Sequence, residues 1–335
     1  MITVVIPSRN RPQYLKRAID YWGKSHWSVV IADGSTEPFT ELLPPNIRYF
    51  RDNGESLPGR ITRVLETLET EFAVLCADDD FLGFTAIDRC LEFLTANPDY
   101  SAAQGEGFKF AQIVSPRFLF VPNMTPKTET HKVDAASASA RMQHAMKPYS
   151  PVFYAVQRRQ VLTAAVKALE GITNPNPVEL QLAIVPSIFG KHAILPFFYS
   201  ARETIAGSAG TEMEDIESWL SNPKSVQELD LWRRRVAEIY SRSGNGSIED
   251  GLDAFELALT TYREYCAETK APPSARVLAK LVPLIKAVLP EKLLAMRRRA
   301  IYRADNNESH FPWGDASALE DWARMKAVIQ KHGVL

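Results

Sequence analysis

Three consecutive aspartates at the end of an apolar run constrain this chain more than any other feature of its sequence. Residues 72–81 read Phe-Ala-Val-Leu-Cys-Ala-Asp-Asp-Asp-Phe, so the acids are Asp78, Asp79 and Asp80. An apolar run of this kind predicts a buried strand that brings the acids to the edge of a sheet. If the strand stays extended, Asp78 and Asp80 project to one face and Asp79 to the other, because side chains alternate along a strand.

These carboxylates predict a cation site. Adjacent acids at the end of a buried segment repel one another, and a bound cation would relieve that repulsion. Oxygen ligands favour Mg²⁺ or Mn²⁺ over zinc, and Mg²⁺ is usually held by one or two carboxylates together with the phosphates of a substrate. A solvated acidic turn or a helix N-cap is the alternative interpretation of the same three residues.

The residues before the triplet predict a parallel sheet of an α/β protein. Strands are expected at residues 2–6, 28–32, 47–50 and from 72 to the aspartates, and helices at residues 12–22 and 60–68. Such alternation predicts right-handed crossovers, and ligands collect at the carboxyl ends of strands connected in this way. The loop after Ile6, Asp33 and the aspartate triplet are therefore expected at one edge of the sheet.

The rest of the chain predicts more strands and helices, followed by a helical region. Helices are expected at residues 86–97, 161–169 and 178–189, and strands around 108–110, 118–121, 150–156 and 192–199. Residues 122–147 are polar and predict a loop and helix near an active site. From residue 213 onward the pattern is that of amphipathic helices. We expect two domains, residues 1–207 and 208–335.

Composition is typical of a folded protein without nucleic-acid partners. The chain has 335 residues, 45% hydrophobic and 24% charged, with a net charge of −1. Its three cysteines are odd in number and have no metal-ligand spacing, which is typical of reduced core residues in the cytoplasm. The first residues resemble a strand rather than a signal peptide, and no apolar run approaches the roughly 18 residues of a membrane span. We expect a soluble or peripheral cytoplasmic protein.

A basic segment stands out in the helical region. Residues 270–299 contain eight Lys and Arg residues and one acid, Glu291, so the net charge of the segment is eight minus one, or +7. A basic amphipathic segment can lie on the anionic inner face of a membrane. The alternative is a helix that packs or forms a homo-oligomer and leaves its basic side in solvent.

Four motifs, taken in order, resemble family 2 glycosyltransferases of the GT-A fold, in particular a bacterial subgroup with an Ala-Asp-Asp-Asp-Phe signature. The first is Val-Val-Ile-Pro-Ser-Arg-Asn at residues 4–10, and the second is Val-Ile-Ala-Asp-Gly-Ser at residues 30–35. The third is the loop with Asn53, Gly54, Gly59 and Arg60. The fourth is residues 77–81, where that family carries its metal and sugar-nucleotide aspartates.

The resemblance implies a metal-dependent enzyme that transfers a sugar from a nucleotide-sugar donor, a UDP-sugar by analogy. The acceptor would be a glycan or glycoconjugate, and the pathway would be the synthesis of a bacterial surface polysaccharide. Mn²⁺ or Mg²⁺ would be held by Asp80 and Asp78, of which Asp80 is the preferred ligand. The register of the triplet stays open, because Asp79 and Asp80 can take the same positions. The residues expected to bind the nucleotide sugar are Pro7, Ser8, Arg9, Asp33, Asn53, Arg60, Asp78 and Asp79.

The resemblance also implies an acid at the start of a later helix, which takes a proton from the acceptor hydroxyl. Glu179 matches that position, in the first turn of the helix expected at 178–189, where the helix dipole favours a carboxylate. Glu203 is the second candidate. A single base opposite the leaving group implies inversion. The alternatives are a metal-dependent nucleotidyltransferase and a non-catalytic scaffold that binds nucleotide sugars. A nucleotidyltransferase is expected to have a glycine-rich, basic loop directly after its first strand, and residues 7–10 contain no glycine.

Overall fold

The computed structural model of the protein describes residues 2–112, 119–120, 126–149, 151–204, 216–269 and 311–333. The strands are β1 (Ile2–Ser8), β2 (Ser28–Asp33), β3 (Ile47–Arg51), β4 (Phe72–Leu75), β5 (Phe81–Leu82), β6 (Tyr100–Gln112), β7 (Leu119–Phe120), β8 (His131–Val133), β9 (Val156–Arg158) and β10 (Lys191–Glu203). The helices are α1 (Pro12–Trp22), α2 (Leu57–Glu66), α3 (Phe84–Ala96), α4 (Ala138–Met146), α5 (Arg159–Lys167), α6 (Pro175–Phe189), α7 (Ile216–Leu220), α8 (Val226–Arg242), α9 (Ile248–Thr269) and α12 (Ala316–His332).

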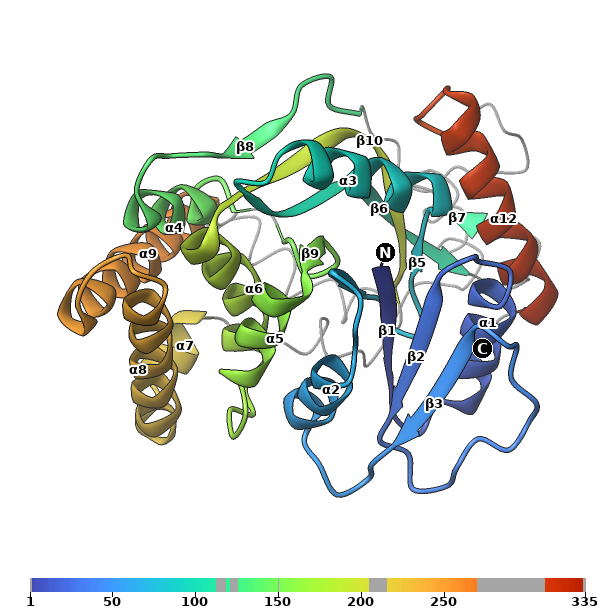
Figure 1. Ribbon diagram of the computed structural model, residues 1–335, viewed down its shortest axis with the longest axis horizontal. Coiled ribbons are helices and arrows are strands. Elements are labelled where there is room, and N and C mark those ends of the chain that lie inside the picture. Colours follow the sequence, from blue (N-terminus) through green and yellow to red (C-terminus); the bar gives the residue numbers. More distant parts are fainter. Residues whose placement is uncertain are drawn as a thin grey trace, which may run out of the picture.

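A single large sheet with helices around it forms the centre of the molecule (Figure 1). Eight of its strands follow the order β3-β2-β1-β4-β9-β6-β10-β5, while β7 pairs with β6 and β8 with β10. Pairing is parallel from β3 to β4 and between β6 and β10, and antiparallel elsewhere. The predicted α/β fold is confirmed, and its second half is a mixed sheet.

Short β-branched strands build the first half of this sheet. Val4, Val5 and Ile6 of β1 are fully buried, as expected for a central strand that is covered on both faces. The parallel register places Ser8, the last residue of β1, beside Asp33, the last residue of β2. Polar side chains of two strands therefore meet at one edge of the sheet.

One predicted helix and one predicted strand have different boundaries in the structure. The helix expected at 178–189 begins earlier, at Pro175, since the Asn174 side chain accepts a hydrogen bond from the Asn176 N–H and prolines fit a first turn. Glu179 is consequently the fifth helical residue, and its predicted place in the first turn is wrong. The strand expected at 150–156 lies instead at Val156–Arg158.

The helical region predicted after residue 213 is confirmed for residues 216–269 and 311–333, but its helices belong to two different cores. Helices α8 and α9 pack with α4 and α6 around Trp232 and Phe255. Helix α12 packs on α1 and α3 at the other end of the molecule, as Figure 1 shows. The predicted boundary between residues 207 and 208 remains a prediction.

Two features of the helical region bear on the membrane prediction. The basic segment at 270–299 lies outside the described residues. Within the part of the chain that the structure describes, every helix is too short or too polar to span a bilayer.

Helix α12 completes the start of α3 with a buried carboxylate. Asp321, only 1% exposed, accepts hydrogen bonds from the backbone N–H groups of Phe84, Thr85 and Ala86 at 2.9–3.2 Å. A Cβ atom on Gly83 would lie 2.4 Å from an oxygen of Asp321, so glycine is needed at that position. Because α3 follows the aspartate triplet by a few residues, α12 braces the segment that carries the triplet.

The substitution Asp321→Ala is expected to lower the free energy of unfolding by about 1–3 kcal/mol, because the first N–H groups of α3 lose their buried acceptor. Asp321→Asn keeps an acceptor oxygen and should lose less. Urea unfolding followed by circular dichroism measures both variants. Lys331→Ala, which removes an exposed ion pair between α12 and Asp20, serves as the control and should change stability by less than about 1 kcal/mol.

Candidate functional site

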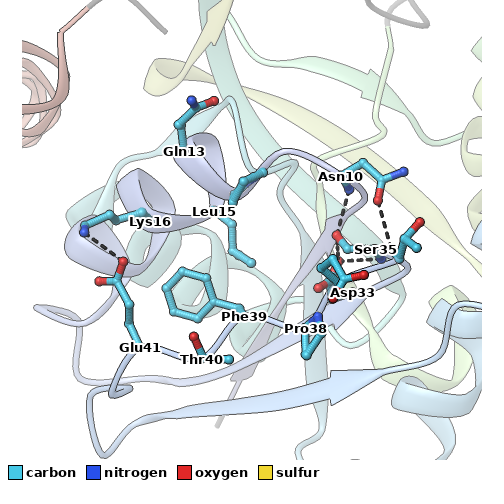
Figure 2. Close-up of a pocket in the computed structure, with 13 residues that line it drawn as sticks. Asn10, Gln13, Leu15, Lys16, Asp33, Ser35, Pro38, Phe39, Thr40 and Glu41 are labelled. Carbon is cyan, nitrogen blue, oxygen red and sulfur yellow. Dashed lines mark hydrogen bonds and ion pairs between the residues drawn. The ribbon is translucent and has the colours of Figure 1, made fainter.

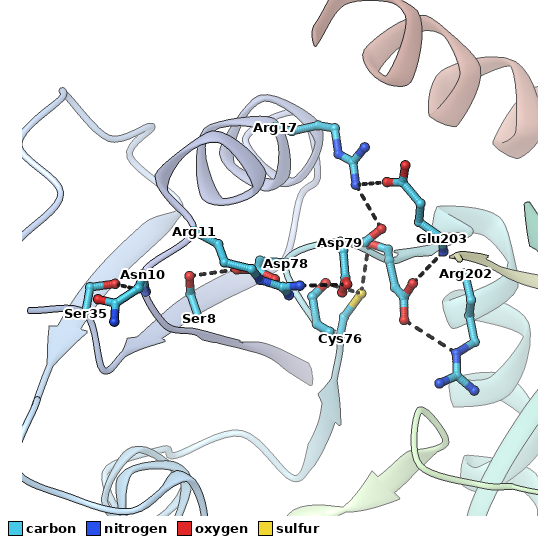
Figure 3. A network of polar contacts seen from close by, with 12 residues as sticks. Ser8, Asn10, Arg11, Arg17, Ser35, Cys76, Asp78, Asp79, Arg202 and Glu203 are labelled. Carbon is cyan, nitrogen blue, oxygen red and sulfur yellow. Dashed lines mark hydrogen bonds and ion pairs between the residues drawn. The ribbon is translucent and has the colours of Figure 1, made fainter. Parts of the chain in front are cut away.

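The aspartate triplet lies in a tight turn between two strands. Strand β4 ends at Leu75, and the backbone N–H of Asp80 donates to the carbonyl of Ala77 at 3.2 Å before β5 begins at Phe81. The extended conformation considered from the sequence is therefore wrong for these residues. In this turn Asp78 and Asp79 share one partner, Arg11 (Figure 3), whereas Asp80 contacts Glu203 and Tyr154.

Asp78 points toward the end of β1 and the start of α1. Its Oδ2 accepts a hydrogen bond from the Ser8 hydroxyl at 2.7 Å, and its Oδ1 pairs with the guanidinium group of Arg11. Burial raises the pKa of Asp78 to about 6, although the charge of Arg11 opposes that rise. The structure thus brings Ser8 and Asp78, both predicted site residues, into direct contact.

Arg11 bridges two of the three aspartates. Besides Asp78, it contacts Asp79, whose Oδ2 lies 2.9 Å from the Arg11 Nη1. Burial by itself would lower the pKa of Arg11, but the two carboxylates outweigh burial and raise it. Figure 3 shows the guanidinium group beside both acids. Arg11 is consequently a permanent cation at this point of the site.

A second arginine of the same helix holds the other side of the turn. The Nη2 of Arg17 donates to the backbone carbonyl of Asp79 at 2.9 Å and lies 2.6 Å from the carboxylate of Glu203. The Arg17 side chain is fully buried and that of Glu203 is 6% exposed. Glu203, predicted as the second candidate for the base, thus forms a buried ion pair that occupies its carboxylate.

Asp80 faces the end of β10. Its Oδ1 accepts the backbone N–H of Glu203 at 2.8 Å, and its Oδ2 accepts the hydroxyl of Tyr154. The Nε of Arg202 lies 3.4 Å from the same oxygen. Burial, together with the charge of Asp79, raises the pKa of Asp80 to about 7. Arg202 thus pairs with Asp80, and the neighbouring Glu203 pairs with Arg17.

The predicted metal ligands do not fit a divalent cation in this conformation. Both oxygens of Asp78 and both oxygens of Asp80 already accept hydrogen bonds from protein donors. Within the described ranges, no three His, Cys, Asp or Glu side chains are arranged to hold a metal ion. Nothing in the structure tests the binding of Mn²⁺ or Mg²⁺ at Asp80 and Asp78 in another conformation, which stays a prediction.

A pocket of about 510 Å³ opens beside Asp33 (Figure 2). One wall is the start of α1 with Asn10 and Leu15, and the other is the loop after β2 with Ser35 and Phe39. The Asp33 carboxylate accepts hydrogen bonds from the N–H and hydroxyl groups of Ser35 at 2.9 and 2.5 Å and from the Tyr49 hydroxyl at 2.6 Å. Its position at the rim of a pocket of this size is suited to a nucleoside.

The other predicted nucleotide residues differ in exposure. Pro7 is half-buried at the end of β1, whereas Arg9 and Asn53 are exposed on loops. Arg60 is buried, and its guanidinium group donates to the backbone carbonyls of Ala32, Asp52 and Glu55 at 3.1–3.4 Å. These contacts give Arg60 a structural part in joining the end of β2 to the loop after β3. Its contact with a nucleotide stays a prediction.

Glu179 is half-buried on α6, on the side of the site that Asp80 and Arg202 occupy. Burial would lower the pKa of Arg202, but nearby charges raise it instead: Tyr154, Asp80 and then Glu179. Glu179 is therefore close enough to act on the arginine that pairs with Asp80. Unlike Glu203, Glu179 has no ion pair within 4.0 Å among the described residues.

The sequence interpretation did not identify Arg11, Arg17 or Tyr154 as site residues. Arg17 carries a signal that could have found it, because it interrupts the apolar face that α1 forms with Leu15 and Ala18. An arginine on a buried helix face needs an acidic partner. No comparable pattern marks Tyr154, which meets Asp80 only through the fold.

The substitution Arg17→Met is expected to destabilise the protein by about 3–5 kcal/mol, since it removes the cation from beside the buried carboxylate of Glu203. The double variant Arg17→Met/Glu203→Gln should recover part of that loss. Urea unfolding measures both. Arg63→Met removes an exposed arginine that also pairs with acids and should cost less than about 1 kcal/mol. Equal losses for Arg17→Met and Arg63→Met would contradict the assigned role of the buried pair.

Comparisons with known proteins find similarity only among solved structures. No family model and no curated protein matches the sequence. A crystal structure of S. aureus TarS has a TM-score of 0.44 at 12% identity, and the match covers 79% of this chain and 54% of that one. A crystal structure of S. aureus TarS 1-349 in complex with UDP-GlcNAc has a TM-score of 0.43 at 13% identity, with 79% and 90% covered. The chain thus spans about half the length of the longer TarS chain that it matches.

Proposed function

We propose that this protein is an inverting glycosyltransferase that moves a sugar from a nucleotide-sugar donor, a UDP-sugar, to a hydroxyl group of a glycan or glycoconjugate. One observation carries the proposal. The ends of the parallel strands β1, β2 and β4 bring Ser8, Asp33 and the aspartate triplet to one edge of the sheet, beside a pocket of nucleoside size. The ordered motifs that resemble family 2 glycosyltransferases fall on these same residues.

The site offers a separate place for each part of such a donor. The pocket beside Asp33 would take the nucleoside, with the carboxylate accepting a hydrogen bond from the base. The first turn of α1 would receive the diphosphate, because backbone N–H groups at a helix start favour anions. The sugar would then lie near Asp80, Arg202 and Glu179. These assignments follow the order of the residues along the sheet edge.

Transfer needs one bond formed and one broken. The acceptor oxygen attacks the anomeric carbon and gives its proton to the carboxylate of Glu179. The bond from the anomeric carbon to the donor phosphate oxygen breaks at the same time, and that oxygen leaves with the electron pair as nucleoside diphosphate. Attack from the side opposite the leaving group inverts the anomeric centre. Glu203 is the less suitable base, because it is held by Arg17.

The proposal also covers the biosynthetic pathway and the place in the cell where the protein acts. We assign the protein to bacterial surface polysaccharide synthesis at the inner face of the membrane, on the strength of the resemblance. Contact of the basic segment at 270–299 with anionic lipid, and formation of a homo-oligomer, are extensions of it. Neither is needed for the chemistry at the sheet edge.

Calorimetric titration of the purified protein with UDP, GDP, CDP and ADP tests donor binding, with Mn²⁺, with Mg²⁺ and with chelator in parallel. We expect one nucleotide to bind and Asp33→Ala to weaken it by about 10-fold or more, as for a lost hydrogen bond to a charged group. Asp99→Ala, an exposed acid that lies outside the pocket, is the control. If no nucleotide binds under any condition, the glycosyltransferase proposal fails.

Glu179→Gln is expected to leave nucleotide-sugar affinity within about twofold of the wild type and to slow turnover by about 10²- to 10⁴-fold, the usual contribution of a general base. Release of free nucleotide by slow hydrolysis of the bound donor measures turnover without an identified acceptor, since water replaces the acceptor hydroxyl. Unchanged turnover would move the base role to Glu203. Donor binding without any turnover in the wild type would instead favour the non-catalytic alternative.

A further inference from the structure

We propose that Arg11 is the resident cation of the donor-diphosphate site, beside Asp78, one of the two aspartates at which the sequence predicts Mn²⁺ or Mg²⁺. This inference rests on the proposed function and deepens it, because it names the group that receives the diphosphate charge. Arg11 lies against two of the aspartates expected to bind the metal and the nucleotide sugar, Asp78 and Asp79. A guanidinium group already supplies the positive charge that these acids need.

The exposure of the three side chains places Arg11 on the solvent side of the acids. The Arg11 side chain is 33% exposed, whereas those of Asp78 and Asp79 are 0% and 10% exposed. An anion that approaches from solvent therefore meets the guanidinium group before it meets the carboxylates. Since Coulomb energy falls with distance, the attraction of the nearer cation outweighs the repulsion of each acid behind it.

Arg11 also has hydrogen-bond donors to spare. A guanidinium group carries five N–H donors, and the hydrogen bonds of Arg11 to the described residues use only two groups, Nη1 to Asp79 and Nη2 to Asp78. The remaining donors can bind phosphate oxygens without releasing the aspartates. Charge-assisted hydrogen bonds from arginine to phosphate are among the strongest in proteins.

The position of Arg11 in the chain supports the same ligand. It directly precedes α1, and no side chain caps the N–H groups of that helix start. The free N–H groups at the start of α1 attract an anion, and the positive charge of Arg11 at the same place strengthens that attraction. The ring of Tyr14 lies 5.0 Å below the guanidinium group and helps to hold it there.

In the transfer step Arg11 would stabilise the leaving group. As the bond between the anomeric carbon and the phosphate oxygen breaks, that oxygen keeps the electron pair and the diphosphate gains negative charge. Hydrogen bonds from a fixed guanidinium group neutralise this charge without a proton transfer. Asp78 and Asp79 act as positioning residues, because they hold Arg11 in place.

Titration of UDP, with GDP, CDP and ADP in parallel, into the purified 335-residue protein in chelator and in Mn²⁺ tests the inference. The wild-type dissociation constant of the nucleotide that binds should change by less than about threefold between the two conditions. Arg11→Ala should weaken nucleotide binding in chelator by about 30-fold or more. The dissociation constant of Arg11→Lys should lie between those of the wild type and Arg11→Ala. Lys24→Ala, an exposed cation after α1, is the control and should bind normally.

A second readout separates this role from a merely structural one. Removal of Arg11 leaves Asp78 and Asp79 without their cation, so Arg11→Ala should bind Mn²⁺ in electron paramagnetic resonance titrations and regain nucleotide affinity with it. The wild type should not bind Mn²⁺ by itself. Nucleotide binding by the wild type that requires Mn²⁺ or Mg²⁺, or binding that survives Arg11→Ala in chelator, would overturn the inference and leave the glycosyltransferase proposal intact. Absence of any nucleotide binding would overturn both.

Discussion

The site depends on buried carboxylates that are paired almost one to one with arginines, of which Arg17 is buried and Arg11 and Arg202 are partly exposed. Four carboxylates, those of the aspartate triplet and Glu203, meet three guanidinium groups, those of Arg11, Arg17 and Arg202. Burying such groups costs several kcal/mol each unless geometry and hydrogen bonds compensate. The compensation comes from three different parts of the chain, namely α1, the turn after β4 and the end of β10. Charge pairing therefore fixes how these three parts meet.

Helix α1 has the central part in this arrangement. It carries Arg17 on its buried face, Arg11 lies immediately before it, and the ring of Tyr14 is 5.0 Å from both guanidinium groups. Its first turn also forms one wall of the pocket beside Asp33. A rotation or shift of this one helix would move both cations and the pocket wall together. The pocket beside Asp33 and the aspartate turn are thus mechanically one unit.

The fold could be read from the sequence where local signals are strong. The β-branched strands around Val4 and Val30 and the helix after Pro12 follow from residue type and spacing, and so does the edge where Ser8 and Asp33 meet. For Asp78 the sequence left both an extended strand end and an acidic turn open, because an apolar run does not reveal where extended structure stops; the structure has the turn, but buried and not solvated. The partners of Asp80 depend on Tyr154 and Arg202, which lie far along the chain.

The carboxylate of Asp321 has a consequence for the order in which the protein matures. Its contact with Phe84 joins residues 237 positions apart in the chain. During synthesis the start of α3 therefore lacks its acceptor until residue 321 has left the ribosome. The N-terminal strands can pair early, since domains begin to fold as they emerge. The helix that follows the aspartates therefore gains its last buried hydrogen bonds late in synthesis, so a nascent chain holds an unfinished site.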